Sequence, residues 1–336
     1  MPSRKVRWGV LGVASIAVRR AIPAMQKGEW TEITAIASRD HRKSDETARL
    51  FGIPKAYGSY AALLADPEIE AVYIPLPNHL HVPWSLRAAQ AGKHVLCEKP
   101  LGVNAAELGA LVEEGNRSGV KIGEAFMVRT HPRWLRTREL IRSGRIGTLR
   151  LITGSFGYSN HDAQNVRNIA EFGGGALLDV GCYAVTLSRF IFGGEPSHVM
   201  GLVERDPEMK IDCLTSAMLA FGSGQSIFTC STQLAYHQRV AFFGTKGRIE
   251  IERALNPAND QPSLIRIDDN PSDPAGAGIT TETTGACDQF TIQGDLFSKA
   301  IRTGGEVPVP LEDSVHNMAT IDAIFRSVES GRWERP

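Results

Sequence analysis

The sequence predicts an α/β protein with two domains, and three observations support this. The chain has 336 residues, which is more than one ordinary hydrophobic core needs. In its first third, short β-rich runs alternate with helical patterns, which predicts a doubly wound parallel sheet covered on both faces. After about Gly147, strand-like runs follow one another across short glycine turns, which predicts a large, open, mainly antiparallel sheet.

Composition and charge exclude several classes of protein. Hydrophobic residues make up 42% of the chain and charged residues 22%, which is typical of globular proteins. Lys+Arg and Asp+Glu both total 37, and this balance argues against nucleic acid or an anionic membrane as a partner. We find neither a signal-peptide pattern nor an apolar run of membrane-spanning length. The five cysteines are scattered without CxxC spacing, so we expect reduced thiols in a cytoplasmic protein and no metal site.

The expected elements follow from hydrophobic periodicity and glycine turns. In the first part we expect strands at Val6–Leu11, Glu32–Ser38, Ala71–Pro75, His94–Cys97 and Lys121–Glu124, and helices at Ser15–Lys27, His41–Phe51, Leu80–Ala91 and Asn104–Ser118. In the second part we expect strands at Leu149–Tyr158, Val199–Asp206, Cys213–Phe221, Ser226–Gln233, Arg239–Phe243 and Arg248–Glu252. We interpret Asn256–Gly285 as a long surface loop, and expect closing helices near Asp288–Thr303 and Leu311–Glu329.

A glycine-containing turn stands where the first strand passes into the first helix, over residues 9–17. Such a turn lets the backbone approach a pyrophosphate, while the helix N-terminus offers N–H donors and a positive dipole. The pattern is degenerate, because Ala14 and Ala17 stand where a strict GxGxxG motif has glycine. Tight packing between strand and helix is the alternative reason for Gly9 and Gly12.

The end of the second strand favours NADP over NAD. An NAD site usually has an acidic residue there, which binds the ribose 2′-hydroxyl group. Here the strand ends in Ser38-Arg39, which can donate to a 2′-phosphate and pair with it, and Arg42 and Lys43 add further positive charge. Asp40 follows at once, and an NAD-type acid placed one position late is the alternative.

Two polar segments follow neighbouring strands, at the edge of the sheet where doubly wound proteins bind ligands. One is Pro77-Asn78-His79-Leu80-His81 and the other is Glu98-Lys99-Pro100. The Lys99 ammonium can stabilise a developing alkoxide or lower the pKa of a neighbour, although a lysine that only forms a salt bridge is the alternative. His79 and His81 lack further ligands at metal-binding spacing, so we favour a role in the loop over metal binding.

A third segment, residues 171–183, combines three glycines with Asp179 and Tyr183. The glycines precede a helix that we expect to run to about Phe192, and the spacing of four places Asp179 and Tyr183 on one face of it. A carboxylate that accepts from hydroxyl groups beside a tyrosine that moves a proton suits a sugar substrate. A core tyrosine with a satisfied hydroxyl is the alternative.

Together these segments resemble the glucose–fructose oxidoreductase, inositol dehydrogenase and rhizopine-catabolism family, written Gfo/Idh/MocA. The resemblance covers nearly the whole chain and rests on the glycine turn, Pro77–His81, Glu98-Lys99-Pro100, Arg129-Thr130-His131-Pro132, Gly173–Tyr183 and Gly244-Thr245-Lys246-Gly247. Tyr183 stands where many members have histidine, which resembles the branch with glucose–fructose oxidoreductase, dihydrodiol dehydrogenase and NADP-dependent pentose dehydrogenases.

The resemblance implies a Rossmann domain over residues 1–125, on which the C-terminal helix 311–329 packs, and a substrate and dimerisation domain over residues 126–310. It implies a cis peptide at Lys99-Pro100 and a homodimer or dimer of dimers through the open sheet. The cofactor-binding residues that we predict are Gly9, Gly12, Ala14, Ser15, Ile16, Ser38, Arg39, Arg42, Leu76, Pro77, Asn78, His81, Glu98, Lys99 and Arg129.

The function predicted is hydride transfer between NADP and a carbohydrate or polyol. Tyr183 then acts as acid and base, Lys99 assists it, and Asp179 and Arg167 bind the substrate. A non-releasing oxidoreductase that shuttles hydride between two sugars is one alternative. A non-catalytic NADP-binding sensor is another, and retention of both Lys99 and Tyr183 argues against it. A glycosidase that uses transient oxidation is disfavoured, because such relatives resemble the histidine branch.

Overall fold

The computed structural model describes residues 4–270 and 278–336, and the chain forms two compact units. Unit 1 comprises Met1–Thr130 and Asp288–Val315, and unit 2 comprises His131–Cys287 and His316–Pro336. The division differs from the one that we predicted, because the chain returns to unit 1 with helix α8 (Gln289–Thr303), whereas most of helix α9 (Leu311–Ser330) belongs to unit 2.

Buried contacts explain why α8 belongs to unit 1. The indole N–H of Trp8 donates to the Ser298 hydroxyl at 3.0 Å, and the Trp8 ring lies 5.6 Å from the ring of Phe297. The Asp295 carboxylate accepts from the backbone amides of Glu29 and Trp30 at 2.8 and 2.9 Å. In unit 2, by contrast, the Ser327 hydroxyl of α9 accepts from the Gly201 amide at 2.8 Å.

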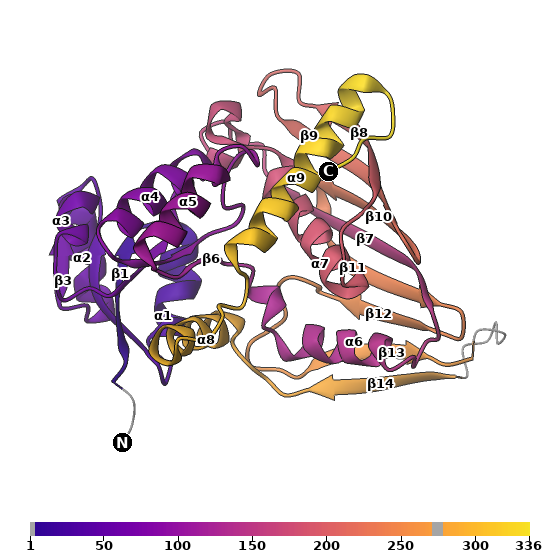
Figure 1. The fold of residues 1–336 in the computed structure, drawn as a ribbon, viewed down its shortest axis with the longest axis horizontal. Coiled ribbons are helices and arrows are strands. Elements are labelled where there is room, and N and C mark those ends of the chain that lie inside the picture. The colour runs from indigo at the N-terminus through magenta and orange to yellow at the C-terminus, as the bar shows by residue number, and fades with distance from the viewer. Residues whose placement is uncertain (1–3, 271–277) are drawn as a thin grey trace. The chain divides into compact units, whose positions relative to one another are not determined.

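Unit 1 contains a six-stranded parallel sheet with the strand order β3-β2-β1-β4-β5-β6 (Figure 1). The strands are β1 (Val6–Leu11), β2 (Thr31–Ala37), β3 (Lys55–Tyr57), β4 (Ala71–Ile74), β5 (His94–Cys97) and β6 (Ile122–Glu124). The order reverses between β1 and β4, and the C-terminal ends of these strands are where doubly wound sheets bind ligands.

The connections between these strands are helical. They are η1 (Ala17–Ala21) with α1 (Ile22–Met25), α2 (His41–Phe51), α3 (Tyr60–Leu64), η2 (Asn78–Leu80) with α4 (His81–Gln90), and α5 (Leu108–Ser118), and η3 (Met127–Arg129) ends this part of the unit. The predicted helix from residue 104 begins only at Leu108, and the predicted first helix contains a π-helical stretch. Strand β3 and helix α3 were not predicted, because three and five residues are too few to show a period.

Unit 2 contains an eight-stranded sheet with the order β14-β13-β12-β11-β7-β10-β9-β8. Its strands are β7 (Leu149–Ser159), β8 (His198–Arg205), β9 (Asp212–Phe221), β10 (Gly224–Ser231), β11 (Gln233–Gly244), β12 (Arg248–Glu252), β13 (Ser263–Asp268) and β14 (Ile279–Thr284). Strands β7 and β10 are parallel, and the other neighbours are antiparallel. The predicted mainly antiparallel sheet is therefore confirmed.

Helices α6 (Pro132–Arg142), α7 (Cys182–Phe192) and α9 lie against one face of this sheet (Figure 1). Trp134 of α6 is fully buried and packs edge-on against Phe242 of β11, with ring centroids 6.2 Å apart. The run Ala170–Phe192 is long and apolar enough to cross a membrane, but 89% of its most apolar window is buried. That burial is expected of a core helix in unit 2.

The predicted long loop at Asn256–Gly285 is wrong, because strands β13 and β14 lie within it. Its many Pro, Asp and Gly residues hid β13, whose side chains alternate between buried and exposed. Strand β14 is an edge strand with the sequence ITTETT and lacks an apolar side to reveal it. Residues 271–277 of the predicted loop lie outside the described residues. Helix α6, with four arginines after its first proline, was also missed.

Candidate active site

Gly9 and Gly12, in the first strand and in the turn after it, are glycines for different reasons. Gly12 has a φ of +119°, a conformation that favours glycine, and a Cβ there would lie 3.0 Å from the Leu76 side chain. Gly9 lies inside β1, where a Cβ would be 2.6 Å from Leu63, so packing accounts for it. The chain turns helical directly after Ala14, at Ser15 and Ile16. This turn therefore presents the first amides of a helix at the end of β1, which fits a pyrophosphate.

The contacts of the residues after β2 distinguish the NADP interpretation of this segment from the NAD interpretation. The Asp40 carboxylate accepts from the Arg42 amide at 3.1 Å and caps α2, and the Ser38 hydroxyl accepts from the Asp40 amide at 3.2 Å. Arg39 is exposed, and its guanidinium lies beside the hydroxyl of Tyr60. Because the Asp40 carboxylate caps α2, the group that this segment presents to a ribose is the Arg39 guanidinium rather than a carboxylate.

Tyr60 was not predicted as a site residue. It is buried, and burial raises the pKa of its phenol, whereas the neighbouring Arg39 acts to lower that pKa. Its ring stands edge-on to Trp84, with centroids 4.8 Å apart. Its hydroxyl lies 3.9 Å from the position that a Cβ on Gly12 would take. Tyr60 thus brings Arg39 and the Gly12 turn to one place, and no sequence pattern indicated this role, because helix α3 is too short to show a period.

His81 joins the loops that follow β4 and β5. Its Nδ1 lies 2.7 Å from the Pro100 carbonyl oxygen and its Nε2 lies 2.6 Å from the Leu76 carbonyl oxygen. The ring is buried, and burial lowers the pKa of His81 to about 4. Both ring nitrogens face backbone, so the structure favours the loop role over metal binding. Among residues 4–270 and 278–336, no group of three His, Cys, Asp or Glu side chains could hold a metal ion.

The turn that carries Lys99 is fixed by buried carboxylates. The Tyr73 hydroxyl donates to Glu98 Oε1 at 2.6 Å, and the Glu124 carboxylate accepts from the Leu101 amide at 2.8 Å. The peptide between Lys99 and Pro100 is cis, as the resemblance implied. Lys99 itself is half-buried. Tyr73 of β4 and Glu124 of β6, both buried on the strands that flank β5, are supporting residues that sequence reasoning missed.

Arg129 has a partner within unit 1. Its Nη1 donates to the Asp313 carboxylate at 2.9 Å, and the arginine side chain is 11% exposed. The predicted cofactor residues Pro77 and Asn78 lie at the start of η2, in the loop that follows β4. Arg42 is exposed and faces Glu46 one turn along α2.

In unit 2, the glycine segment opens a buried helix. The π-helical η6 (Leu177–Gly181) continues directly into α7, so Asp179 lies in the π-helical part and Tyr183 in the α-helical part. Short π-helical insertions occur frequently at functional sites. Asp179 and Tyr183 are 9% and 6% exposed.

Both oxygens of Asp179 have partners, one from the end of β7 and one from the segment between β7 and the glycine turn. The Tyr158 hydroxyl donates to Oδ2 at 2.6 Å, and Arg167 Nε donates to Oδ1 at 3.0 Å. Burial, and then the Asp179 charge, raises the pKa of Tyr158 above its usual range, so the phenol keeps its proton and remains a donor. This network joins the predicted Asp179 and Arg167 through contacts of unit 2 alone. Tyr158 was predicted as the last residue of a strand and not as a site residue.

Two family models match the chain. Residues 6–126 match the oxidoreductase family with an NAD-binding Rossmann fold, and residues 134–250 match the GFO/IDH/MocA C-terminal domain. The chain is 46% identical over 330 residues to an uncharacterised oxidoreductase of Rhizobium meliloti, covering 98% of each chain. It is 40% identical to an NADP-linked D-xylose 1-dehydrogenase of Haloferax volcanii, covering 96% of this chain and 98% of the relative.

Two solved structures share the fold of the whole chain. A 3-ketoreductase from Actinomadura kijaniata in complex with NADP and TDP-benzene has a TM-score of 0.89 at 30% identity, covering 96% of this chain and 98% of that one. Its solved variants include a lysine-to-alanine and a tyrosine-to-phenylalanine substitution. An aldose–aldose oxidoreductase from Caulobacter crescentus has a TM-score of 0.91 at 27% identity, covering 99% and 100%.

Proposed function

The chain belongs to the GFO/IDH/MocA oxidoreductase family, and we propose that it is an NADP-dependent dehydrogenase of a sugar or polyol. The observation that carries the proposal is the Asp179 carboxylate, which Tyr158 and Arg167 hold on the same helical run as Tyr183. A fixed, charged acceptor beside a tyrosine suits a substrate with several hydroxyl groups.

The residues of unit 1 fit NADP. The amides after Gly12 would hold the pyrophosphate, and Ser38 and Arg39 would hold the 2′-phosphate, since Asp40 is engaged in capping α2. When bound, the nicotinamide takes up or returns the hydride. The NADP named with the Haloferax dehydrogenase and with the Actinomadura ketoreductase supports the same cofactor.

The proposed chemistry divides between three side chains of this chain. Tyr183 accepts the proton of the substrate hydroxyl in the oxidative direction and returns it in the reductive direction. Lys99 stabilises the tyrosinate and the oxyanion that forms on the substrate. Asp179 accepts a hydrogen bond from a neighbouring substrate hydroxyl, and Arg167 keeps the carboxylate oriented.

A substrate screen tests the proposal directly. Purified protein with NADP and a panel of aldoses, ketoses, inositols and diols is followed by absorbance of the reduced nicotinamide, in both directions. We expect NADP-dependent turnover of at least one pentose or hexose, and a much lower Michaelis constant for NADP than for NAD. Absence of turnover in both directions, with NADP still bound, would instead indicate a sensor.

A second candidate is an oxidoreductase that keeps its NADP and passes hydride between two sugars. The likeness to the aldose–aldose oxidoreductase of Caulobacter crescentus favours it. Protein that still carries cofactor after gel filtration, and that oxidises one sugar only when a second is present, would support this candidate. Stoichiometric release of NADPH to solution would support the free-cofactor dehydrogenase.

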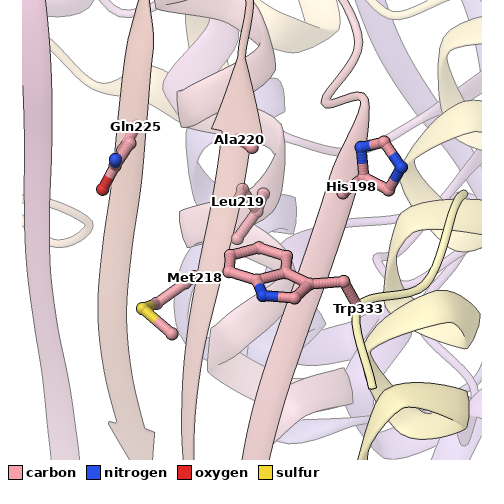
Figure 2. Close-up of a pocket in the computed structure, with 6 residues that line it drawn as sticks. All are labelled: His198, Met218, Leu219, Ala220, Gln225 and Trp333. Atoms are coloured by element: carbon pink, nitrogen blue, oxygen red, sulfur yellow. The ribbon is translucent and has the colours of Figure 1, made fainter.

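We also propose a homodimer through the face of the unit 2 sheet opposite to α6, α7 and α9. Apolar side chains there are exposed, such as Leu202 at 75% and Met218 and Ile227 at 38%. Figure 2 shows the indole of Trp333 reaching across β8 toward Met218, beside a hollow of about 450 Å³ that contains none of the predicted site residues. Such a patch is typical of an interface. Sedimentation equilibrium should give twice the mass of one chain, and a monomer would contradict the proposal.

A further inference from the structure

Asp212 is a buried carboxylate at the first residue of β9, and the mechanism above does not use it. It is 2% exposed. Its Oδ2 accepts from the Leu177 amide at 2.7 Å and from the Thr215 hydroxyl at 2.8 Å. Leu177 is the first residue of η6, and the first amides of a helix have no partner within that helix. Asp212 therefore caps the helical run that carries Asp179 and Tyr183.

The glycines before this helix fit the approach of the Asp212 carboxylate. Gly175 has a φ of +123°, and a Cβ there would lie 1.9 Å from Asp212 Oδ1. A Cβ on Gly174 would lie 2.5 Å from the Arg167 carbonyl oxygen, which accepts from the Gly175 amide at 2.9 Å. The glycine turn is thus held by a carboxylate from β9 and by the backbone of Arg167, the residue that pairs with Asp179.

The surroundings of Asp212 contain few other charges. Burial raises its pKa to about 6, while the Leu177 amide, the Thr215 hydroxyl and the more distant Arg205 act in the opposite direction. The Asp212 charge acts on the thiols of Cys230 and Cys213, and burial raises the pKa of each thiol, so both stay protonated at neutral pH. Asp179 also acts on Cys230. An ionised Asp212 is further favoured by the positive end of the helix dipole.

We propose that Asp212 is a positioning residue for the proposed active site. It fixes the start of the η6–α7 run and so sets where Asp179 and Tyr183 stand relative to the substrate. The inference rests on the proposed function, since it assigns these two residues to the reaction. Because a misplacement of about 1 Å can cost about 100-fold in rate, a loosened helix start is enough to slow turnover.

Three variants test this role. Asp212→Ala removes both bonds, Asp212→Asn keeps an acceptor oxygen of the same reach but not the charge, and Thr215→Val removes one donor. The matched control is Asp288→Asn, because Asp288 caps α8 in unit 1 by accepting from the Phe290 amide at 3.0 Å. Each variant is measured by steady-state kinetics with the sugar found in the screen, and by native-state amide hydrogen exchange.

We expect the turnover of Asp212→Ala to fall by about 100-fold and that of Asp212→Asn by about 10-fold. The Michaelis constant for NADP should stay unchanged. We expect an acidic limb in the kcat profile of the parent protein, from protonation of Asp212, and this limb should be missing in Asp212→Asn. Exchange protection should be lost at the Leu177 and Asp179 amides but retained along β9 and β10. The control should keep its turnover.

Two results would overturn the proposal. One is full turnover in Asp212→Ala, and the other is unchanged protection of the Leu177 amide. If Asp212→Ala does not fold, Asp212→Asn decides by its turnover and by its kcat profile, and unchanged values of both would overturn the proposal. Failure of the proposed function shows differently, because the parent protein would then lack turnover while the exchange experiment would still report whether Asp212 holds the helix start.

Discussion

Each unit contains a tyrosine, an aspartate and a cation in direct contact, and the two sets differ in their surroundings. In unit 1, the Tyr57 hydroxyl and the Lys55 ammonium both bind Asp66 Oδ2, at 2.8 and 2.7 Å. The Glu68 amide donates to Asp66 Oδ1 at 2.9 Å. Burial alone would raise the pKa of Asp66, but Lys55, the Glu68 amide and Tyr57 lower it to about 2.

In unit 2, the Tyr158 hydroxyl and the Arg167 guanidinium bind different oxygens of Asp179. This aspartate lies in a π-helical stretch after a glycine turn, whereas Asp66 lies just after the short helix α3. The first set ties β3 to the end of α3. The second ties the end of β7 and the segment after it to the helix of Tyr183. Residue types alone therefore do not distinguish a structural set from the set that we propose to be functional. The two sets are distinguished by the helix that each aspartate belongs to or follows.

The largest effect on turnover is expected at Lys99 and Tyr183. No effect on turnover is expected in the unit 1 set of Lys55, Tyr57 and Asp66. Lys99→Ala and Tyr183→Phe should each lower turnover by about 10²–10⁴-fold, because each removes a group that handles the proton or its charge. Lys55→Ala and Tyr57→Phe are the matched controls and should keep turnover. Near-parent rates in either Lys99→Ala or Tyr183→Phe, measured with NADP saturating, would remove that residue from the mechanism.

Acid stability should depend on buried histidines in both units, and one histidine in each unit is bound in the same way. His94 Nδ1 accepts from the Lys121 amide at 2.9 Å, and His131 Nδ1 accepts from the Arg133 amide at 3.0 Å. Burial lowers the pKa of each to about 4. An unfolded histidine binds its proton near pH 6.5, so folding loses stability as the pH falls from 6.5 to 4, by up to about 3 kcal/mol per histidine.

Asp212 acts in the opposite direction, since its folded pKa of about 6 exceeds the unfolded value of 3.8. One carboxyl does not offset three histidines, with His81 of unit 1 counted beside His94 and His131, so urea unfolding should shift to lower denaturant concentration between pH 7 and pH 5. His94→Asn and His131→Asn offer an acceptor that does not titrate, and together they should weaken this dependence, while His81 keeps part of it. An unfolding midpoint that is independent of pH in the parent protein would refute the assignment.

A smaller effect is expected at the cofactor's 2′-phosphate. Arg39→Ala should raise the Michaelis constant for NADP by about 10–100-fold, because a charge-assisted hydrogen bond contributes about 1.5–3 kcal/mol, and should leave that for NAD unchanged. Arg49→Ala is the control on α2, where Arg49 is 77% exposed and pairs with Asp45. An equal rise in the Michaelis constants for NADP and NAD would show that Arg39 does not bind the 2′-phosphate.

The sequence predicted unit 1 better than unit 2, for a physical reason. In unit 1 the site depends on local features, such as the glycine at φ +119° and the strand ends at β4 and β5, and these leave signals in consecutive residues. The contacts of Tyr60, Tyr158 and Asp212 depend on partners 12 or more residues away, or on a short element, and no periodicity reveals them. Strands β13 and β14 were missed because turn-forming residues surround them.

The smallest expected effect tests the comparison most directly. Tyr158→Phe deletes the hydroxyl that donates to Asp179, and Tyr57→Phe deletes its counterpart on Asp66. Each loss should cost about 1 kcal/mol, because one intramolecular hydrogen bond is lost in each case. In Tyr158→Phe this should appear as a decrease of about 5–10-fold in kcat/KM for the sugar, and in Tyr57→Phe only as a lower unfolding free energy. Equal kinetic effects would mean that the two sets do not differ in function, since the bond that is removed is the same.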